Sequence, residues 1–345
     1  MKILISSDGL HAHFYQRSAW INAFETCGIQ TYFWDCKQVP AFDVFDAFEP
    51  DLFLGQSYNL TPDLIKCIYE RPHLKVGLRS GDWGDQEKEV DKTKYNILYC
   101  SEQEKQILKK LKEETGQPEF VHIHYNDEEI QRTHNHFETI GIKPVSIMMC
   151  ADTTIYNDAE PQEDLRCDIG FVGGYWPYKG QVINEYLFPM LDSFKYKVKI
   201  FGNSPWPANQ YCGVIDDDQL KDLFVSAKIC PNLSEPHAQK FGIDVNERIF
   251  KILCSGGFCI SDYVKSYEMF GDGVVLAKTP EDFRDKIKYY LENHNERVII
   301  SKRGQQYVRQ NHTGFHRVSK LLKSFGYEDL SNNIIEKYKE LINEN

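Results

Sequence analysis

The sequence lacks several features that mark membrane, exported and metal-binding proteins. No apolar run approaches the roughly 20 residues that a membrane-spanning helix requires. The N-terminus carries neither the long apolar region nor the small-residue cleavage site of a signal peptide. None of the 10 cysteines belongs to a Cys-x-x-Cys pair, which argues against zinc and thioredoxin-like motifs and favours reduced, buried thiols. We therefore expect a cytoplasmic protein without a transmembrane segment.

Positive charge is also scarce. The chain of 345 residues has 40 Lys and Arg against 51 Asp and Glu, a formal net charge of −11. Broad, sequence-independent binding to nucleic acid needs clustered cations, so this composition argues against it. A local basic pocket for one diphosphate remains compatible with the balance. With 41% hydrophobic and 13% aromatic residues, the composition is that of a folded globular protein.

What the chain does contain is an alternation of short β-rich runs and amphipathic stretches, the pattern of α/β layering. The expected strands are Lys2–Ser6, Thr31–Trp34, Asp51–Leu54, Lys75–Leu78, Ile97–Cys100, Phe120–His124, Asp168–Val172, Val198–Phe201, Ala227–Pro231, Phe258–Ser261 and Val274–Leu276. A polar segment at residues 157–164 divides them into two series and is typical of an interdomain linker.

The pattern predicts two Rossmann-like α/β domains that face a cleft. We expect residues 1–160 to form the first domain, residues 165–325 the second, and residues 326–345 a C-terminal helical tail. Ligands of such sheets bind beyond the carboxyl ends of the strands, so the loops that follow the strands are the places to search for chemistry.

A glycine-rich turn follows the first strand of the second series. The segment Gly170–Gly180 contains the pair Gly173 and Gly174 and, further along, Lys179. Glycines let backbone N–H groups approach an anion closely, and a lysine adds a mobile charge for phosphate. No Walker pattern is present and strand-Gly-Gly turns are common, so an ordinary structural turn remains the alternative.

A polar loop and an expected helix form the second candidate. Residues 231–235 lead toward a helix at Asn246–Cys254, which carries Arg248 near its start and Lys251 on the same face. The start of a helix supplies unpaired N–H groups and a positive dipole end, and arginine adds a bidentate contact, so a diphosphate suits this position. Two cations there are unfavourable unless an anion neutralises them.

The residues around this helix start leave two points open. Either Asp244 or Asn246 is suited to cap the helix. The two cations of the helix are placed either to meet a ligand or to pair with Asp244 and Glu247 on a solvated face. The first alternative predicts a binding site, and the second predicts an ordinary helix surface.

Five elements in order between Asp168 and Leu322 resemble the C-terminal domain of GT-B glycosyltransferases. They look closest to the CgeB-like (spore-maturation-protein-like) branch of the family-1/family-4 group. The elements are Gly173–Gly180, Gly213–Lys228, Pro231–Glu235, Asn246–Gly257 and Asn311–Arg317. The resemblance implies a glycosyltransferase that moves a sugar from a nucleotide-sugar donor, held by the second domain, to an acceptor held by the first.

The resemblance also implies a set of donor-binding residues. They are Gly173, Gly174, Lys179, Asn203, Glu235, His237, Glu247, Arg248 and Lys251. The implied donor is a UDP- or GDP-sugar used as a co-substrate, with no metal and no resident cofactor. Where the family helix carries a glutamate that bonds the donor ribose, this chain has Lys251, which either contacts phosphate or indicates an unusual donor. Glu247, one turn earlier, is the alternative partner of the ribose.

Catalytic residues are expected in loops of the first domain. His11 and His13 follow the first strand, and a histidine there suits a general base at neutral pH, although ordinary loop roles remain the alternative. Asp82 is a second candidate base. His122 and His124 share a strand face but lack a third ligand at a recognisable spacing, so a metal site is not expected.

Three alternatives to metal-independent sugar transfer remain open. The first is an epimerase or hydrolase of the same shape. The second is a catalytically altered GT-B scaffold that binds a sugar nucleotide, and the third is a viral-type enzyme that glycosylates nucleic-acid bases. The acceptor is unidentified: a glycan, a small molecule or, against the acidic composition, a nucleic acid.

Overall fold

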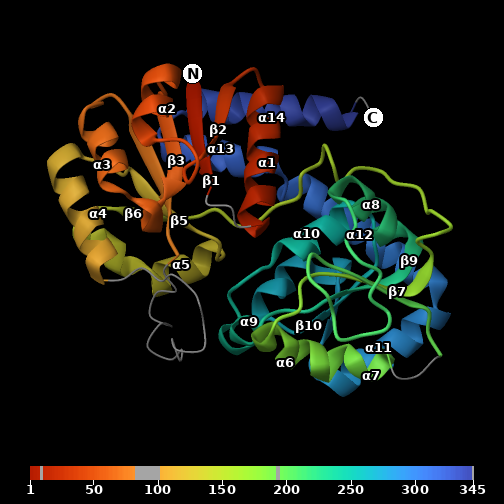
Figure 1. The fold of residues 1–345 in the computed structure, drawn as a ribbon. Helices are drawn as coiled ribbons and strands as arrows, with labels where there is room; N and C mark the ends of the chain where they lie inside the picture. Colours follow the sequence, from red (N-terminus) through yellow and green to blue (C-terminus); the bar gives the residue numbers. More distant parts are fainter. Residues whose placement is uncertain (8–10, 82–101, 192–194, 344–345) are drawn as a thin grey trace. The chain divides into compact units, whose positions relative to one another are not determined.

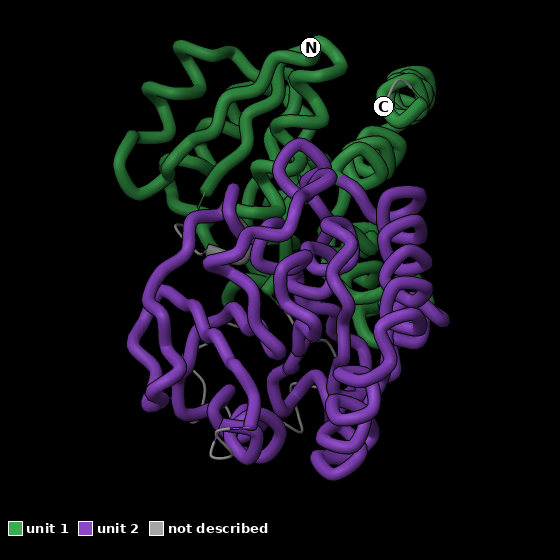
Figure 2. Tube along the Cα trace, turned by 90° about the vertical axis from the view of Figure 1, so that its right-hand side faces the viewer, with its two compact units in different colours: residues 1–148, 314–345 green, residues 149–313 purple. Residues whose placement is uncertain are grey.

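The computed structural model describes residues 1–7, 11–81, 102–191 and 195–343. These form two compact units, shown in separate colours in Figure 2. Unit 1 consists of residues 1–148 and 314–345, and unit 2 of residues 149–313. Each unit is a parallel sheet with flanking helices, so the predicted α/β fold with two Rossmann-like sheets is confirmed (Figure 1).

The sheet of unit 1 has the order β2-β1-β3-β4-β5-β6 with all neighbours parallel. Its strands are β1 (Lys2–Ser7), β2 (Gln30–Asp35), β3 (Leu52–Gln56), β4 (Lys75–Arg79), β5 (Phe120–Ile123) and β6 (Lys143–Ser146). Its helices are α1 (His11–Thr26), α2 (Ala41–Phe48), α3 (Pro62–Tyr69), α4 (Glu102–Thr115), α5 (Asp127–Thr133), α13 (Gly314–Ser324) and α14 (Glu328–Asn343). The near-continuous burial of β1 and β3 is what a parallel sheet covered on both faces requires.

The sheet of unit 2 has the order β11-β10-β9-β7-β8, again all parallel. Its strands are β7 (Cys167–Val172), β8 (Val198–Phe201), β9 (Ala227–Asn232), β10 (Cys259–Asp262) and β11 (Val275–Ala277). Its helices are α6 (Pro177–Tyr186), α7 (Phe188–Leu191), α8 (Asp217–Ser226), α9 (Pro236–Phe241), α10 (Glu247–Cys254), α11 (Pro280–Glu292) and α12 (His294–Asn311). The 3₁₀ segment of unit 2 is Lys265–Gly273. Two further 3₁₀ segments, Ser57–Asn59 and Asn135–Ile140, belong to unit 1.

The expected strands match the observed ones closely, with two exceptions. The run Ile97–Cys100 lies outside the described residues. Strand β6 was not expected, because Pro144 interrupts a short run. Proline cannot donate a ladder hydrogen bond and is tolerated at an edge, and β6 is the last strand of its sheet.

The boundaries of the two units differ from the expected domains, which were residues 1–160, residues 165–325 and a tail at residues 326–345. Residues 314–345 belong to unit 1, because α13 packs against α1 and α14 packs against α13. The first residue of α13 has to be Gly314, since a Cβ there would collide with the carbonyl oxygen of Ala19 in α1. Arg317 adds a hydrogen bond from Nε to the carbonyl oxygen of Met148, 2.8 Å long. The last two helices are thus part of the first domain rather than an appended tail.

The described cysteines are all free, and most are buried. Burial raises the pKa of the Cys167 and Cys254 thiols to about 12 each, so these groups stay protonated and unreactive at neutral pH. In the part of the chain that the structure describes, every helix is too short or too polar to cross a membrane.

Candidate functional site

The carboxyl edge of the unit 2 sheet gathers most of the predicted donor residues. Strands β7, β8, β9 and β10 are parallel and end at Val172, Phe201, Asn232 and Asp262. The loops that follow them, together with α6, α9 and the start of α10, surround this edge (Figure 1). In sheets of this kind the edge is where ligands bind.

The glycine turn after β7 makes room for a guanidinium group. A Cβ added to Gly173 would lie 2.8 Å from Nη2 of Arg248, so a side chain at this position would displace the guanidinium group. The backbone N–H of Gly173 donates to the carbonyl oxygen of Phe201 at 2.9 Å, and its own carbonyl oxygen accepts from Trp206 Nε1 at 2.9 Å. The turn is therefore held rigidly while Arg248 passes beside it.

Arg248 is buried, with only 7% of its surface exposed. Its Nε donates to the carbonyl oxygen of Val172 at 2.6 Å, and its Nη1 donates to the carbonyl oxygen of Leu233 at 3.2 Å. Nη1 also lies 3.3 Å from Asn232 Oδ1, and the guanidinium carbon lies 4.8 Å from the ring centre of Phe171. These contacts fix the group between β7 and β9. The alternative of a cation on a solvated helix face is wrong for Arg248.

Lys179, in the first turn of α6, is the second buried cation, at 8% exposure. Its ammonium lies 4.9 Å from the ring centre of Trp176. Burial, and then the positive charge of Arg248, lower the pKa of Lys179 to about 8. Among the described residues, no carboxylate forms an ion pair within 4 Å of Lys179 or Arg248. Two neighbouring buried cations without a bonded anion are a costly arrangement for a folded protein.

Lys251 is also buried, at 5% exposure, so the alternative of a cation on a solvated helix face is wrong for Lys251 as well. Its ammonium lies 5.5 Å from the ring centre of Tyr156. Burial lowers the pKa of Lys251 to about 8, with the Glu247 and Asp217 carboxylates acting in the opposite direction. For Glu247, burial opposes ionisation, but the charges of Lys251 and Arg248 outweigh it and lower the pKa of the carboxyl group.

The cap of α10 is Asn246 and not Asp244. Its Oδ1 accepts from the N–H of Ile249 at 3.4 Å, while its Nδ2 donates to the hydroxyl of Tyr267 at 2.9 Å. Asp244 instead lies near His237, with 3.4 Å between Oδ2 and Nε2.

Helix α9 (Pro236–Phe241) brings His237 to the site. Its Nδ1 lies 3.6 Å from Oε2 of Glu235 and 3.3 Å from the hydroxyl of Tyr178. The rings of His237 and Tyr178 are stacked, with 6.0 Å between centroids. Burial raises the pKa of Glu235, against the opposing charges of His237 and Lys179. Asn203 follows β8 at the same edge and is exposed.

Sequence reasoning missed Asp262, the residue on which this edge is organised. It is fully buried at the end of β10, and both carboxylate oxygens accept from the N–H of Ser234 at 3.1 Å. Gln239 Nε2 donates to it at 2.7 Å, and the Ser234 hydroxyl lies 2.8 Å from that of Tyr267. Burial raises the pKa of Asp262 against these hydrogen bonds. Because Ser234 and Gln239 are distant from Asp262 in sequence, no local pattern predicted these hydrogen bonds.

The carboxyl edge of the unit 1 sheet carries a second polar network that was not anticipated. Arg79, the last residue of β4, donates from Nε to His124 Nε2 and from Nη1 to the Tyr58 hydroxyl, the latter at 2.7 Å. His124 Nδ1 lies 3.0 Å from the carbonyl oxygen of Ile147. These partners assign the proton of the neutral imidazole to Nδ1, with Nε2 as acceptor.

His122 and His124 do share a face, with ring centroids 6.2 Å apart. His122 packs edge-on against Trp20 at 5.5 Å. In the described part of the chain, no group of three or more His, Cys, Asp or Glu side chains is placed to hold a metal ion.

Three candidate catalytic residues are not placed by the structure. Helix α1 begins at His11, so His11 and His13 belong to its first turn, but their side chains lie outside the described residues. Asp82 lies outside the described residues altogether. Their roles remain predictions.

Residues 183–323 match a protein-family model described as glycosyl transferase-like. The matched segment contains α10 with Arg248 and Lys251, and it begins just after Lys179. No curated protein matches the sequence.

Solved structures share the fold over nearly the whole chain. T4 phage β-glucosyltransferase in complex with UDP-glucose is 11% identical, with a TM-score of 0.57, covering 96% of this chain and 99% of its own. An α-glucosyltransferase in complex with UDP is 8% identical, with a TM-score of 0.61 and coverage of 93% and 98%. The spinosyn forosaminyltransferase SpnP is 9% identical, with a TM-score of 0.52 and coverage of 94% and 99%. Together with the family match, this shared architecture supports a transferase, a glycosyltransferase of GT-B fold.

Proposed function

We propose that the chain transfers a sugar from a nucleotide-sugar donor to an acceptor hydroxyl without a metal ion, and that it belongs to the CgeB-like branch. The observation that carries the proposal is the pair of buried cations, Lys179 and Arg248, at the carboxyl edge of the unit 2 sheet. Neither has a bonded carboxylate among the described residues. Burial lowers the pKa of both cations.

A diphosphate is chemically suited to bind these two buried cations. Its oxygens accept hydrogen bonds from a guanidinium and an ammonium at once, and its charge offsets the cost of burying both. During sugar transfer, negative charge grows on the departing diphosphate, so cations held in place beforehand stabilise the transition state more than the ground state. In this proposal, Gly173 and Gly174 allow the backbone to approach the diphosphate, while Arg248 and Lys179 bind it.

The remaining donor residues would hold the sugar and the ribose. Glu247, whose pKa is lowered, is a carboxylate at neutral pH and is suited to accept hydrogen bonds from ribose hydroxyls. Glu235 and His237, whose side chains lie 3.6 Å apart, belong to the loop and helix after β9, where a donor sugar would lie. UDP is the preferred nucleotide, because the structural neighbours include complexes with UDP-glucose and UDP.

The acceptor would be held by unit 1. His11, His13 and Asp82 remain the proposed general bases, and Arg79 with His124 would orient a hydroxyl-bearing acceptor at the carboxyl edge of the sheet. This division assigns charge recognition to unit 2 and hydroxyl recognition to unit 1.

A donor screen tests the proposal. Full-length protein is heated with UDP-, GDP-, dTDP- and CDP-sugars, since a ligand that binds the folded state raises its apparent stability. We expect one UDP- or GDP-sugar to raise the melting temperature in the wild type and in Lys288→Gln, a matched surface control on α11. We expect Lys179→Gln and Arg248→Lys to lose the shift. No shift with any donor, or a shift that survives both variants, would refute the site.

Nucleotide release then separates the enzymatic alternatives. Release only with an added acceptor supports transfer, release without one indicates a hydrolase or epimerase, and binding without release indicates an altered scaffold. Activity that persists in EDTA supports metal independence, whereas loss of activity that Mg²⁺ or Mn²⁺ restores contradicts it.

Nucleic acid is the second candidate acceptor. A structural neighbour over 96% of this chain is described as the DNA-modifying enzyme β-glucosyltransferase. The net charge of −11 argues in the other direction. Labelled sugar that enters duplex DNA, and not a glycan or small-molecule mixture, would decide for this acceptor.

A further inference from the structure

Asp262, at the end of β10, is a fully buried carboxylate whose hydrogen-bond partners are all uncharged. It accepts from Ser234 and Gln239 at 2.7 to 3.1 Å, and Ser261 Oγ lies 3.3 Å from its Oδ1. Among the described residues, no cation forms an ion pair with it. An ionised group in this position is costly to bury, because hydrogen bonds alone replace its water.

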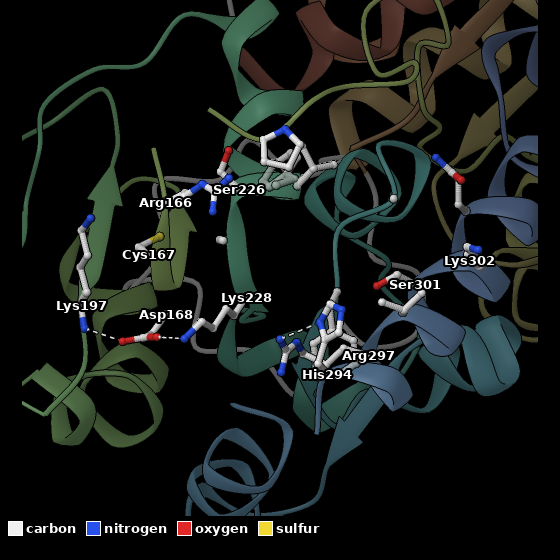
Figure 3. A pocket seen from close by; sticks show the side chains of 18 residues that line it. Arg166, Cys167, Asp168, Lys197, Ser226, Lys228, His294, Arg297, Ser301 and Lys302 are labelled. Carbon is white, nitrogen blue, oxygen red and sulfur yellow. Dashed lines mark hydrogen bonds and ion pairs between the residues drawn. The ribbon is translucent and has the colours of Figure 1, made fainter. Parts of the chain in front are cut away.

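A second carboxylate of the same sheet has a different environment. Asp168, near the start of β7, lines a cavity of about 700 Å³, where it accepts from Lys228 Nζ at 2.7 Å and from the N–H of Lys197 at 2.9 Å (Figure 3). For Asp168, burial is outweighed by the hydrogen bonds and charges of these lysines, and the pKa is lowered. For Asp262, burial outweighs the hydrogen bonds, and the pKa is raised. Ionised Asp168 therefore stabilises the fold, whereas ionised Asp262 destabilises it.

The partners of Asp262 continue into a directed chain of hydrogen bonds. The N–H of Ile249 donates to Oδ1 of Asn246, so Nδ2 of Asn246 donates to the hydroxyl of Tyr267 at 2.9 Å. That hydroxyl lies 2.8 Å from Ser234 Oγ, which lies 3.0 Å from Asp262 Oδ1. A backbone N–H only donates and a carboxylate only accepts, so the two ends of the chain assign every hydrogen in it. With an ionised Asp262, Tyr267 donates to Ser234, and Ser234 donates to the carboxylate.

Two arms of this network hold the loop and the helix that follow β9. Ser234, which donates to Asp262 from its backbone N–H as well as its hydroxyl, immediately precedes Glu235. Gln239 donates to Asp262 at 2.7 Å and lies in the same helix, α9, as His237. Glu235 and His237 therefore stand on backbone that Asp262 fixes.

Two further arms reach α10. Asn246 is the N-cap of this helix, which carries Arg248 in its first turn. Arg248 Nη1 lies 3.3 Å from Asn232 Oδ1, and Asn232 Nδ2 donates to Ser261 Oγ at 3.0 Å. Ser261 in turn contacts Asp262. One buried carboxylate is thus connected by two routes to the helix whose arginine is proposed to bind the diphosphate.

We propose that Asp262 is a positioning residue of the donor site, whose ionised carboxylate sets the direction of this network and so fixes the loop of Ser234, helix α9 and the start of α10 before a donor binds. The role rests on the donor function proposed above. Groups that are held in place beforehand lose less freedom when a ligand binds, and this raises the affinity.

The charge of Asp262 also acts on the second buried cation of the site. Burial, and then the charge of Arg248, lower the pKa of Lys179 to about 8. Three carboxylates act in the opposite direction: Glu235, Glu247 and Asp262. Ionised Asp262 therefore helps Lys179 to keep its proton, and a neutral residue in its place would not.

Two neutral substitutions interrupt the network without a change of charge. Ser234→Ala removes the hydroxyl at its centre, and Tyr267→Phe removes the hydroxyl that joins Ser234 to Asn246. UDP and GDP are the probes, titrated calorimetrically against the full-length chain, and melting temperatures verify folding. We expect each variant to bind the nucleotide about tenfold more weakly than the wild type. Amide exchange in residues 233–249 of the free protein should be faster.

Tyr289→Phe is the matched control for these variants. It removes an exposed hydroxyl of the same unit, bonded to Glu296 at 2.7 Å, and should bind nucleotide like the wild type.

Asp262→Asn tests the charge. Asparagine keeps an oxygen that accepts from Ser234, and the amide of Gln239 can turn to accept from its nitrogen, so the hydrogen bonds are retained while the charge is lost. We expect the alkaline fall in nucleotide affinity to begin at lower pH than in the wild type, because Lys179 then loses its proton more readily. Asp168→Asn, at the opposite edge of the sheet, is the matched control and should keep the wild-type profile.

The possible outcomes separate this role from the donor function. If the wild type binds a nucleotide and Ser234→Ala and Tyr267→Phe bind it equally well, the positioning role alone is wrong. Weaker binding without faster amide exchange would indicate direct contact of these hydroxyls with the ligand and would contradict it too. An unchanged pH profile in Asp262→Asn would show that the carboxylate is not ionised in the wild type, against the proposal. A wild type that binds neither nucleotide would overturn the donor function, and the positioning role with it.

Discussion

The carboxyl edges of the two sheets have the same backbone architecture but different side-chain chemistry. In unit 2, three cations (Lys179, Arg248 and Lys251) are buried, and burial lowers the pKa of each. In unit 1, Arg79 is joined to the neutral groups His124 and Tyr58 by hydrogen bonds.

This difference shows that the fold determines where a ligand site lies, whereas the side chains determine the charge of the ligand that the site favours. Lys179 and Arg248, which have no bonded carboxylate among the described residues, favour a ligand that brings negative charge. In unit 1 the charged Arg79 already donates to the neutral groups His124 and Tyr58, and such neutral donors and acceptors suit hydroxyl groups. The proposed function places the diphosphate at unit 2 and the acceptor at unit 1, and mutations can test each half of this proposal.

The largest effect is expected for Arg248→Lys. Lysine keeps the charge but loses the planar fork that reaches Val172, Leu233 and a diphosphate at once. We expect turnover to fall about 100-fold or more, as for removal of a fixed electrostatic stabiliser. Steady-state kinetics with the donor found in the screen measure it, with circular dichroism to verify folding. Turnover within a few-fold of the wild type would contradict the assignment of this residue.

His124→Asn tests the unit 1 half of the comparison. Asparagine keeps a polar group but loses the ring that joins Arg79 to the carbonyl oxygen of Ile147. We expect kcat/KM for the acceptor to fall about tenfold, with no change in donor Kd. Donor titration and acceptor kinetics on the same preparation separate the two quantities. A change in donor Kd of the same size would break the proposed division between the sheets.

Donor affinity should depend on pH because Lys179 and Lys251 have pKa values of about 8. Below pH 8 both ammonium groups are charged and attract the diphosphate; above it they lose their protons, and affinity falls by up to tenfold per pH unit for each lysine that contacts the donor. Titration calorimetry across this range measures the profile. The Lys179→Gln variant should show a flatter one, and an unchanged profile would remove Lys179 from the site.

The smallest effect, about 1 kcal/mol, is expected for the stability of Lys251→Met. Because burial lowers the pKa of Lys251 below the value of an unfolded chain, ionised Lys251 destabilises the fold at neutral pH, and an apolar side chain of similar length removes that cost. The net gain is small, because the substitution also removes the charge that lowers the pKa of Glu247. Urea unfolding at pH 7 should show the gain.

The sign of this effect can be checked by raising the pH. Between pH 8 and the higher pKa of the unfolded chain, folded Lys251 is already neutral while the unfolded chain still binds the proton, so wild-type stability rises with pH. The advantage of Lys251→Met should shrink accordingly. A variant that is less stable than the wild type at neutral pH would show that the ammonium group contributes to folding.

Local sequence patterns predicted much of the fold. The strand at Val198–Phe201 was predicted with its observed bounds, and the helix carrying Arg248 was predicted to within one residue, because apolar periodicity and a capping residue are local signals. Strand β6 was missed, since Pro144 weakens the pattern and only its position at an edge makes it tolerable.

The candidate site was predicted in part. Lys179, Glu235, His237 and Arg248 do meet at one edge, as the parallel order of the strands requires. The choice of Asn246 over Asp244 as the cap was open, since both side chains suit the position. The network around Asp262 could not be predicted, because Ser234 and Gln239 lie 28 and 23 residues away and become its neighbours only in the folded sheet.

By itself, the sequence determined the alternation of strands and helices, and hence two parallel sheets whose strand ends gather polar loops. Tertiary structure alone decided how charge is used there. The fold buries Arg248 and Lys251, although the sequence was also compatible with a solvated face for both. It also places α13 in the first domain, through the contact of Gly314 with Ala19. The physical reason is that periodicity is a property of neighbouring residues, whereas the cost of burying a charge depends on everything that surrounds it in the folded chain.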